Sequence, residues 1–222
     1  MKKRHPVIKV LRKIVRFVTP KRETIWLTPY DGEPCIFVCN HARAGGPLAM
    51  CIHFPLVEKT HPWIIAPMLR AREVPDYVRG DFWWQPGKWY TKILDHTLPY
   101  PIALILPPIL RGTEPVPVYH DMRIISTFKK SIEVLKDGDS LVIFPEKPEG
   151  FGDYGKQLNT GFLFIAQNYY NKTGKSLKFY PTYIDEDKLT TTIYEPIAYD
   201  PNRTLEAQTD SIIDAISKTI VR

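Results

Sequence analysis

Three apolar runs in this chain each end in residues that could carry out acid–base or anion-binding chemistry. They are Cys35–Cys39 followed by Asn40-His41, Val116–Tyr119 followed by His120 to Arg123, and Leu141–Phe144 followed by Pro145-Glu146-Lys147. The carboxyl ends of parallel strands meet at one edge of a sheet, which is where α/β proteins bind ligands. We therefore expect the histidine base, the glutamate and the basic side chains to lie within reach of one another.

The segment after His41 predicts an anion site beside that histidine. Gly45 and Gly46 indicate a tight turn, and Pro47 is typical of the first turn of a helix. A helix N-terminus offers free N–H groups and the positive end of the helix dipole. The simpler alternative is a strand-end histidine that is hydrogen-bonded to backbone.

The elements that must position these residues alternate between strand and helix along the chain. The expected strands are Thr24–Leu27, Cys35–Cys39, Trp63–Pro67, Glu114–Tyr119, Ser140–Phe144, Leu177–Ile184 and Thr190–Tyr194, and the expected helices are Pro47–Val57, Arg123–Lys136, Leu158–Asn171 and Leu205–Val221. A glycine-rich loop is expected between Glu146 and Leu158. This pattern predicts one α/β domain over residues 23–222, with a mixed, largely parallel sheet flanked by helices.

The amino-terminal segment, residues 1–22, carries nine Lys or Arg and no acid, although the whole chain has a net charge of only +6. Residues 7–18 have apolar side chains on one helical face and basic ones on the other, which predicts a basic amphipathic helix. Such a helix favours the surface of an anionic bilayer. A helix that packs on the domain is the alternative, and nucleic acid is a weaker one because Phe17 is the single Phe, Tyr or Trp of the segment, so aromatic residues are not interleaved with the charges.

The cysteines and histidines indicate neither a disulfide framework nor a metal site. Three cysteines are an odd number, and they lie in or beside apolar runs, so we expect a reducing compartment and packing roles for them. The histidines lack the spacing of metal ligands, and no metal is predicted. With the basic segment, this suggests a peripheral protein on the cytoplasmic face of a membrane.

Residues 98–110 form an uncharged run that contains four prolines. The prolines and the short length argue against a helix that spans a bilayer. The run could line an acyl-chain groove, dip into the membrane interface, or cover the core as a proline-rich excursion. These alternatives stay open at the level of sequence.

In order and spacing, the motifs over residues 35–185 resemble the glycerolipid (lysophosphatidate-type) acyltransferases. That family has Asn-His, four residues and Asp; then a short apolar strand leading to Arg; then Phe-Pro-Glu-Gly-Thr-Arg; then an apolar strand with a proline. The corresponding segments here are Asn40–Gly46, Val116–Arg123, Phe144–Glu149 and Phe179–Ile184.

The resemblance implies transfer of a fatty acyl group from acyl-CoA or acyl-carrier protein to a hydroxyl of a lysophospholipid-like acceptor, with no further cofactor. His41 would be the general base, and Glu146 would position the acceptor. The remaining candidates would bind substrate, and they are Asn40, Arg43, His120, Arg123 and Lys147.

The chain departs from the family pattern at its most important point, because Gly46 stands where the family has Asp. The carboxylate that should orient His41 is therefore missing from the motif. The family Arg is also absent from its usual place, and Lys147 replaces a glycine. Either another acid, such as Asp121, Glu146 or Asp153, takes over, or the protein binds lipid or acyl groups without transferring them.

Overall fold

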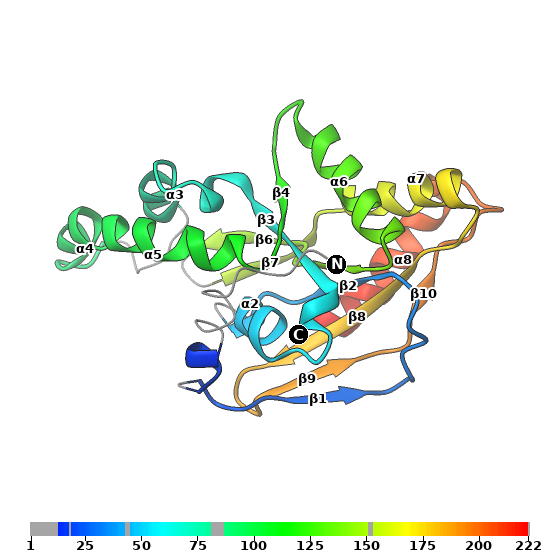
Figure 1. Cartoon of the computed structure of the whole chain (residues 1–222), viewed down its shortest axis with the longest axis horizontal. Helices are drawn as coiled ribbons and strands as arrows, with labels where there is room; N and C mark the ends of the chain where they lie inside the picture. The colour runs from blue at the N-terminus through cyan, green and yellow to red at the C-terminus, as the bar shows by residue number, and fades with distance from the viewer. Residues whose placement is uncertain (1–12, 18, 43–44, 81–86, 151–152, 222) are drawn as a thin grey trace.

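A mixed, largely parallel sheet forms the centre of the fold, which confirms the predicted α/β class (Figure 1). The computed structural model describes residues 13–17, 19–42, 45–80, 87–150 and 153–221. The strand order is β1-β9-β8-β2-β5-β3-β4, and β10 also pairs with β8. The bounds are β1 (Glu23–Trp26), β2 (Cys35–Cys39), β3 (Thr60–Ile65), β4 (Val116–Val118), β5 (Ser140–Ile143), β8 (Lys178–Asp185), β9 (Thr190–Ile193) and β10 (Ile197–Ala198).

Five neighbouring strands, from β8 through β2, β5 and β3 to β4, run parallel, whereas β9 is antiparallel to β8. All five residues of β2 are buried, because both faces of the sheet are covered. Ile36 and Val38 point into one apolar cluster and Phe37 into the other. The continuous apolar run around residue 37 therefore became the central strand.

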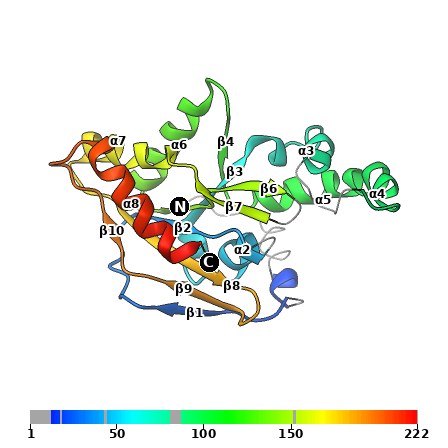
Figure 2. The same ribbon diagram turned by 180° about the vertical axis from the view of Figure 1, so that it is seen from behind.

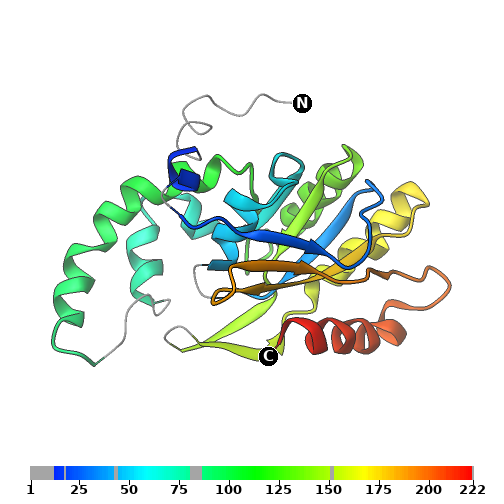
Figure 3. The same cartoon turned by 90° about the horizontal axis from the view of Figure 1, so that it is seen from below.

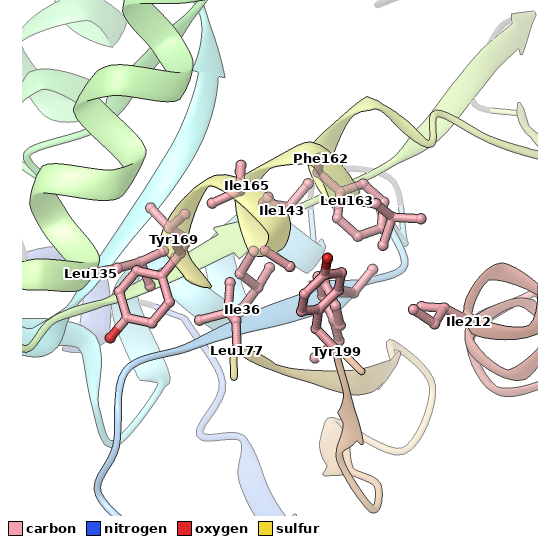
Figure 4. Close-up of a cluster of buried hydrophobic side chains, with 14 of the residues drawn as sticks. Ile36, Leu135, Ile143, Phe162, Leu163, Ile165, Tyr169, Leu177, Tyr199 and Ile212 are labelled. Atoms are coloured by element: carbon pink, nitrogen blue, oxygen red, sulfur yellow. The ribbon is translucent and has the colours of Figure 1, made fainter. Parts of the chain in front are cut away.

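Helices cover both faces of this sheet (Figure 2). The larger ones are α3 (Val74–Gly80), α4 (Thr91–Thr97), α5 (Pro99–Arg111), α6 (Ile124–Lys136), α7 (Phe164–Thr173) and α8 (Leu205–Ile220); α2 (Gly45–Leu48) continues into a π-helical turn, η1 (Ala49–His53), and the 3₁₀ turns are η2 (Val57–Lys59), η3 (Ala66–Leu69) and η4 (Gly161–Leu163). Side chains of α6, α7 and α8 pack with Ile36 and Ile143 in the cluster of Figure 4. Met50 of η1 and Phe54 pack on Phe37 at the opposite face.

The predicted loop after Glu146 is instead a β-hairpin of β6 (Glu146–Gly150) and β7 (Asp153–Leu158). The predicted helix Leu158–Asn171 begins later, at Phe164, after η4. Leu158 is buried and is paired with Glu146 in the hairpin, which places it in a strand. The register shifts between Glu146 and Gly150 account for the irregular, glycine-rich pattern that suggested a loop.

The proline-rich run is helical in the structure, and with α3 and α4 it projects away from the sheet (Figures 1 and 3). Pro99 occupies the first turn of α5, where its missing N–H costs nothing, whereas Pro107 and Pro108 lie inside the helix. A small cluster of Val74, Val78 and Ala103 supports α5 on α3. This local core explains why the run is helical despite its prolines.

The described part of the amino-terminal segment is helical over residues 13–17. Its apolar side chains Ile14 and Phe17 are 53 % and 90 % exposed. A hydrogen bond of 2.8 Å joins Thr19 Oγ1 to Nε2 of His53, so the segment meets the domain beside η1. The rest of the predicted amphipathic helix, residues 7–12 and 18, lies outside the described residues, and membrane binding stays a prediction.

Candidate functional site

Asn40 closes the end of β2 by extending the strand ladder with its side chain. Its Oδ1 accepts a hydrogen bond from the Ile184 N–H at 2.6 Å, and its Nδ2 donates to the Ile184 carbonyl at 3.0 Å. The amide thus takes the place that a further residue of β2 would have had beside β8. The main chain is released from the sheet at this point, and His41 is the first residue of the turn.

The turn after His41 folds back on itself and requires glycine at position 46. The Gly46 N–H donates to the His41 carbonyl at 3.0 Å. A Cβ on Gly46 would overlap that carbonyl oxygen and would lie 2.9 Å from the carbonyl oxygen of Asn40. Backbone atoms cannot move aside as a flexible side chain can, so the missing family Asp has no room in this turn.

The structure brings His41 and Glu146 together at adjacent parallel strands. Oε2 of Glu146, just past β5, accepts a hydrogen bond of 2.5 Å from the His41 backbone N–H. The ring of Phe144 lies 5.3 Å from the imidazole, centre to centre. Both main-chain polar groups of His41 are therefore held, and its side chain leaves the turn against an aromatic surface.

Burial raises the pKa of Glu146, and the hydrogen bond from His41 offsets only part of that shift. The carboxyl is half-buried at the base of the β6–β7 hairpin. A carboxyl with a raised pKa beside a histidine is common at catalytic sites, and structural networks also produce it. Its hydrogen bond to the backbone N–H of His41 makes Glu146 the first candidate for the acid that positions this histidine.

Of the other two acids that could replace the family Asp, Asp121 is engaged by an arginine and the side chain of Asp153 is not described. Asp121 is held by Arg123 through hydrogen bonds of 2.6–3.0 Å, and this pairing lowers the pKa of Asp121 to about 2. Asp153 lies at the start of β7, in the part of the hairpin whose side chains are not described.

The predicted substrate-binding residues divide into three groups. Arg43 lies outside the described residues, and Lys147 is placed in β6 by its backbone alone. His120 is exposed just past β4. The guanidinium of Arg123 lies 4.6 Å from the centre of the Tyr119 ring and is paired with Asp121, so its charge is largely compensated.

A cavity of about 430 Å³ lies past the carboxyl end of β3 and alongside β4. Its lining includes Glu114 and two arginines that the sequence analysis did not identify. Arg70 follows η3 and is paired with Glu73 at 2.7 Å. Arg111 ends α5 and donates through Nε and Nη2 to the Leu69 carbonyl. Neither lies near a motif, and only the folding of residues 66–119 around β3 and β4 brings them together.

A second acid, Glu186, follows β8 and lies against the glycine turn. Glu186 is paired with the buried Arg22 at 2.6 Å, and a Cβ on Gly45 would overlap its carboxylate. The start of β1 and the end of β8 therefore meet the turn through a charged pair. No group of three metal-ligating side chains occurs among the described residues.

We expect Gly46→Ala to lower the free energy of unfolding by about 1–3 kcal/mol, because the new methyl group meets backbone oxygens. Urea unfolding measures the change. Gly161→Ala is the matched control, since a Cβ there meets no atom within 4 Å. Equal stability of the two variants would contradict the tight turn at Gly46.

We expect Glu146→Gln to raise the unfolding temperature at neutral pH. The folded state raises the pKa of this carboxyl above its ordinary 4.5, so its ionisation destabilises the fold increasingly as the pH rises from that value. The advantage of the variant should disappear below about pH 4, where both states are protonated. Glu133→Gln, on the exposed face of α6, is the control. A stability loss at neutral pH in Glu146→Gln would contradict this account.

The sequence matches no protein-family model and no curated protein sequence. The geometry of the strand ends is therefore what a functional proposal for this chain has to rest on.

Proposed function

We propose that this protein transfers a fatty acyl group from an acyl thioester, acyl-CoA or acyl-carrier protein, to a hydroxyl of a lysophospholipid-like acceptor. One observation carries the proposal. Asn40-His41 and Phe144-Pro145-Glu146 end adjacent parallel strands, and Glu146 is hydrogen-bonded to His41. These are the residues on which the resemblance to glycerolipid acyltransferases depends.

His41 is the general base in this reaction. An alcohol is a weak nucleophile until a positioned base takes its proton. The imidazole removes the hydroxyl proton while the oxygen attacks the thioester carbonyl carbon. The tetrahedral oxyanion then collapses, the C–S bond breaks, and the leaving thiolate takes the proton back from the imidazolium.

Glu146 is a positioning residue for His41 in this proposal. In the family pattern a carboxylate one turn along holds the imidazole through its side chain. Here the turn excludes that residue, and the backbone of His41 is held by Glu146 and Gly46 instead. The ionised Glu146 also places negative charge next to the residue that becomes a cation, which stabilises the imidazolium.

Arg70 and Arg111 provide the acceptor side of the site. One strand, β3, separates β5 from β4 in the sheet, so the arginine-lined cavity lies to the side of Glu146, with the end of β3 between them. That separation suits a headgroup whose hydroxyl reaches the base while its anionic group pairs with arginine. The expected acceptor therefore carries a phosphate or a similar anion.

A protein that binds lipid or acyl groups without transferring them is the second candidate. Gly46 favours it, because the orienting carboxylate of the family pattern is absent and has no room. The two functions differ in turnover.

We expect His41→Ala to lower acceptor-dependent acyl transfer by about 10²–10⁴-fold without a large change in unfolding temperature. Radiolabelled acyl-CoA and acyl-carrier protein, incubated with a panel of lysophospholipids, give the measurement. Binding of acceptor without acyl transfer by the wild type would support the second candidate. Transfer that His41→Ala leaves unchanged would refute the role of the histidine.

We expect Arg70→Gln/Arg111→Gln to raise the KM for an anionic acceptor by about tenfold or more and to leave kcat nearly unchanged, since lost charge-assisted contacts weaken binding in the ground and transition states alike. Arg203→Gln, before α8, is the matched control. An unchanged KM would exclude the cavity as the acceptor site.

A further inference from the structure

The helices α4 and α5 present an apolar surface to the outside of the molecule. Of the twelve large apolar side chains that are exposed in the described residues, half lie between positions 89 and 105. They are Trp89, Ile93, Leu98, Tyr100, Leu104 and Ile105. Leu104 is 75 % and Trp89 is 82 % exposed, which is an unusual concentration for a surface that faces water.

This apolar surface belongs to a supported element, because the inner side of the two helices is packed and hydrogen-bonded. Ala103 is buried against Val74 and Val78 of α3. Arg79 of α3 donates from Nε to the carbonyl of Asp95 at 2.9 Å and lies over the ring of Tyr100. The fold therefore holds the outer residues in place on α3.

The composition of the surface fits a phospholipid bilayer better than another protein. No charged residue occurs between Leu98 and Leu110, and Lys88, Lys92 and Arg111 lie at the margins. Tryptophan and tyrosine prefer the membrane interface, and cations at its edge pair with lipid phosphates. No single described helix is long and apolar enough to cross a bilayer, but α4 and α5 together, bent by 54° where they meet, pass the same criteria.

The prolines of α5 limit how deeply this helix can insert into a bilayer, so that it stays at the interface. Pro107 and Pro108 lack the N–H groups that would bond the carbonyls of Ala103 and Leu104 in a regular helix. Such carbonyls need partners, which are present among headgroups and water and absent from the hydrocarbon core. The two helices are therefore suited to lie at the interface rather than to cross the membrane.

The position of α4 and α5 agrees with this assignment. Figures 1, 2 and 3 place these helices and the helical residues 13–17 in the same half of the molecule. Phe17 is exposed there beside the basic residues of the amino-terminal segment. The base of α5 contributes Arg111 to the cavity that we assign to the acceptor.

We propose that α4 and α5 form a docking arm, a bent pair of consecutive helices that inserts its apolar face into the interface of a phospholipid bilayer. The docking arm is a second membrane contact, separate from the basic segment 1–22. This proposal rests on the proposed function only in the choice of a lipid surface as partner. Its test measures vesicle binding and not acyl transfer.

The test uses the full chain and vesicles of phosphatidylcholine and phosphatidylglycerol. We expect Leu104→Glu/Ile105→Glu to weaken vesicle binding in a flotation assay at least about tenfold, because two charges replace two apolar contacts with lipid. Leu27→Glu is the matched control, since Leu27 is 55 % exposed after β1, at the other edge of the sheet from β4. It should bind as the wild type does.

A second measurement does not depend on added charge. An environment-sensitive fluorophore on Leu104→Cys should shift its emission to the blue when vesicles are added, and the same label on Leu27→Cys should not. Vesicle binding that Leu104→Glu/Ile105→Glu leaves intact would overturn the inference. So would a dimer of the wild type that the double substitution dissociates, because the occupant would then be a second copy of the chain.

The two proposals fail separately. Vesicle binding that depends on α4 and α5, without acyl transfer, would support the docking arm and refute the proposed reaction. Acyl transfer with vesicle binding that does not depend on α4 and α5 would refute the docking arm and leave the proposed reaction.

Discussion

The end of β2 is fixed by hydrogen bonds to both of its neighbouring strands. The Asn40 amide occupies the N–H and the carbonyl of Ile184 on the side of β8, and the Glu146 carboxylate binds the His41 N–H on the side of β5. Because β2 pairs in parallel with both strands, a shift of one residue in either register would separate these partners. The position of His41 thus follows from the packing of the central sheet, and its rigidity comes from the most buried strand of the fold.

The tight turn and the half-buried carboxyl that hold His41 lower the stability of the fold, and the packing of the sheet must offset this loss. The turn closes so tightly that position 46 admits no side chain, and Glu146 remains half-buried with a raised pKa. Sites that hold groups in unfavourable surroundings give up stability for function. Ionisation of Glu146, which is hydrogen-bonded to His41, therefore destabilises the fold. The turn that begins at His41 also leaves no room at position 46 for the Asp of the family pattern.

The sequence predicted β2, β5 and β8 and the helices α6 and α8 because their apolar patterns are unambiguous, whereas β3 begins three residues before its predicted start. It also paired His41 with Glu146 through the rule that parallel strands end at one edge. Other features depend on tertiary contacts. The β6–β7 hairpin combines glycines with charged residues, a composition that is typical of a loop. The helix α5 is stabilised by the packing of Ala103 on α3, and its four prolines argue against a helix when the sequence is considered alone. Arg70 and Arg111 are forty-one positions apart and belong to no motif, so only the fold makes them neighbours.

A lipid acceptor lies in a bilayer, so an enzyme that uses it must bring its site to the surface of that bilayer. In the two proposals, the basic segment 1–22 would supply an electrostatic attraction to the membrane and the apolar α4–α5 pair a hydrophobic one. Single signals of either kind give weak and reversible binding, whereas two together anchor a protein. Since the helical residues 13–17 and the α4–α5 pair lie in the same half of the molecule, with the arginine-lined cavity at the base of α5, simultaneous contact would turn the carboxyl edge of the sheet toward the lipid. The acceptor could then pass from the bilayer to His41 without crossing water.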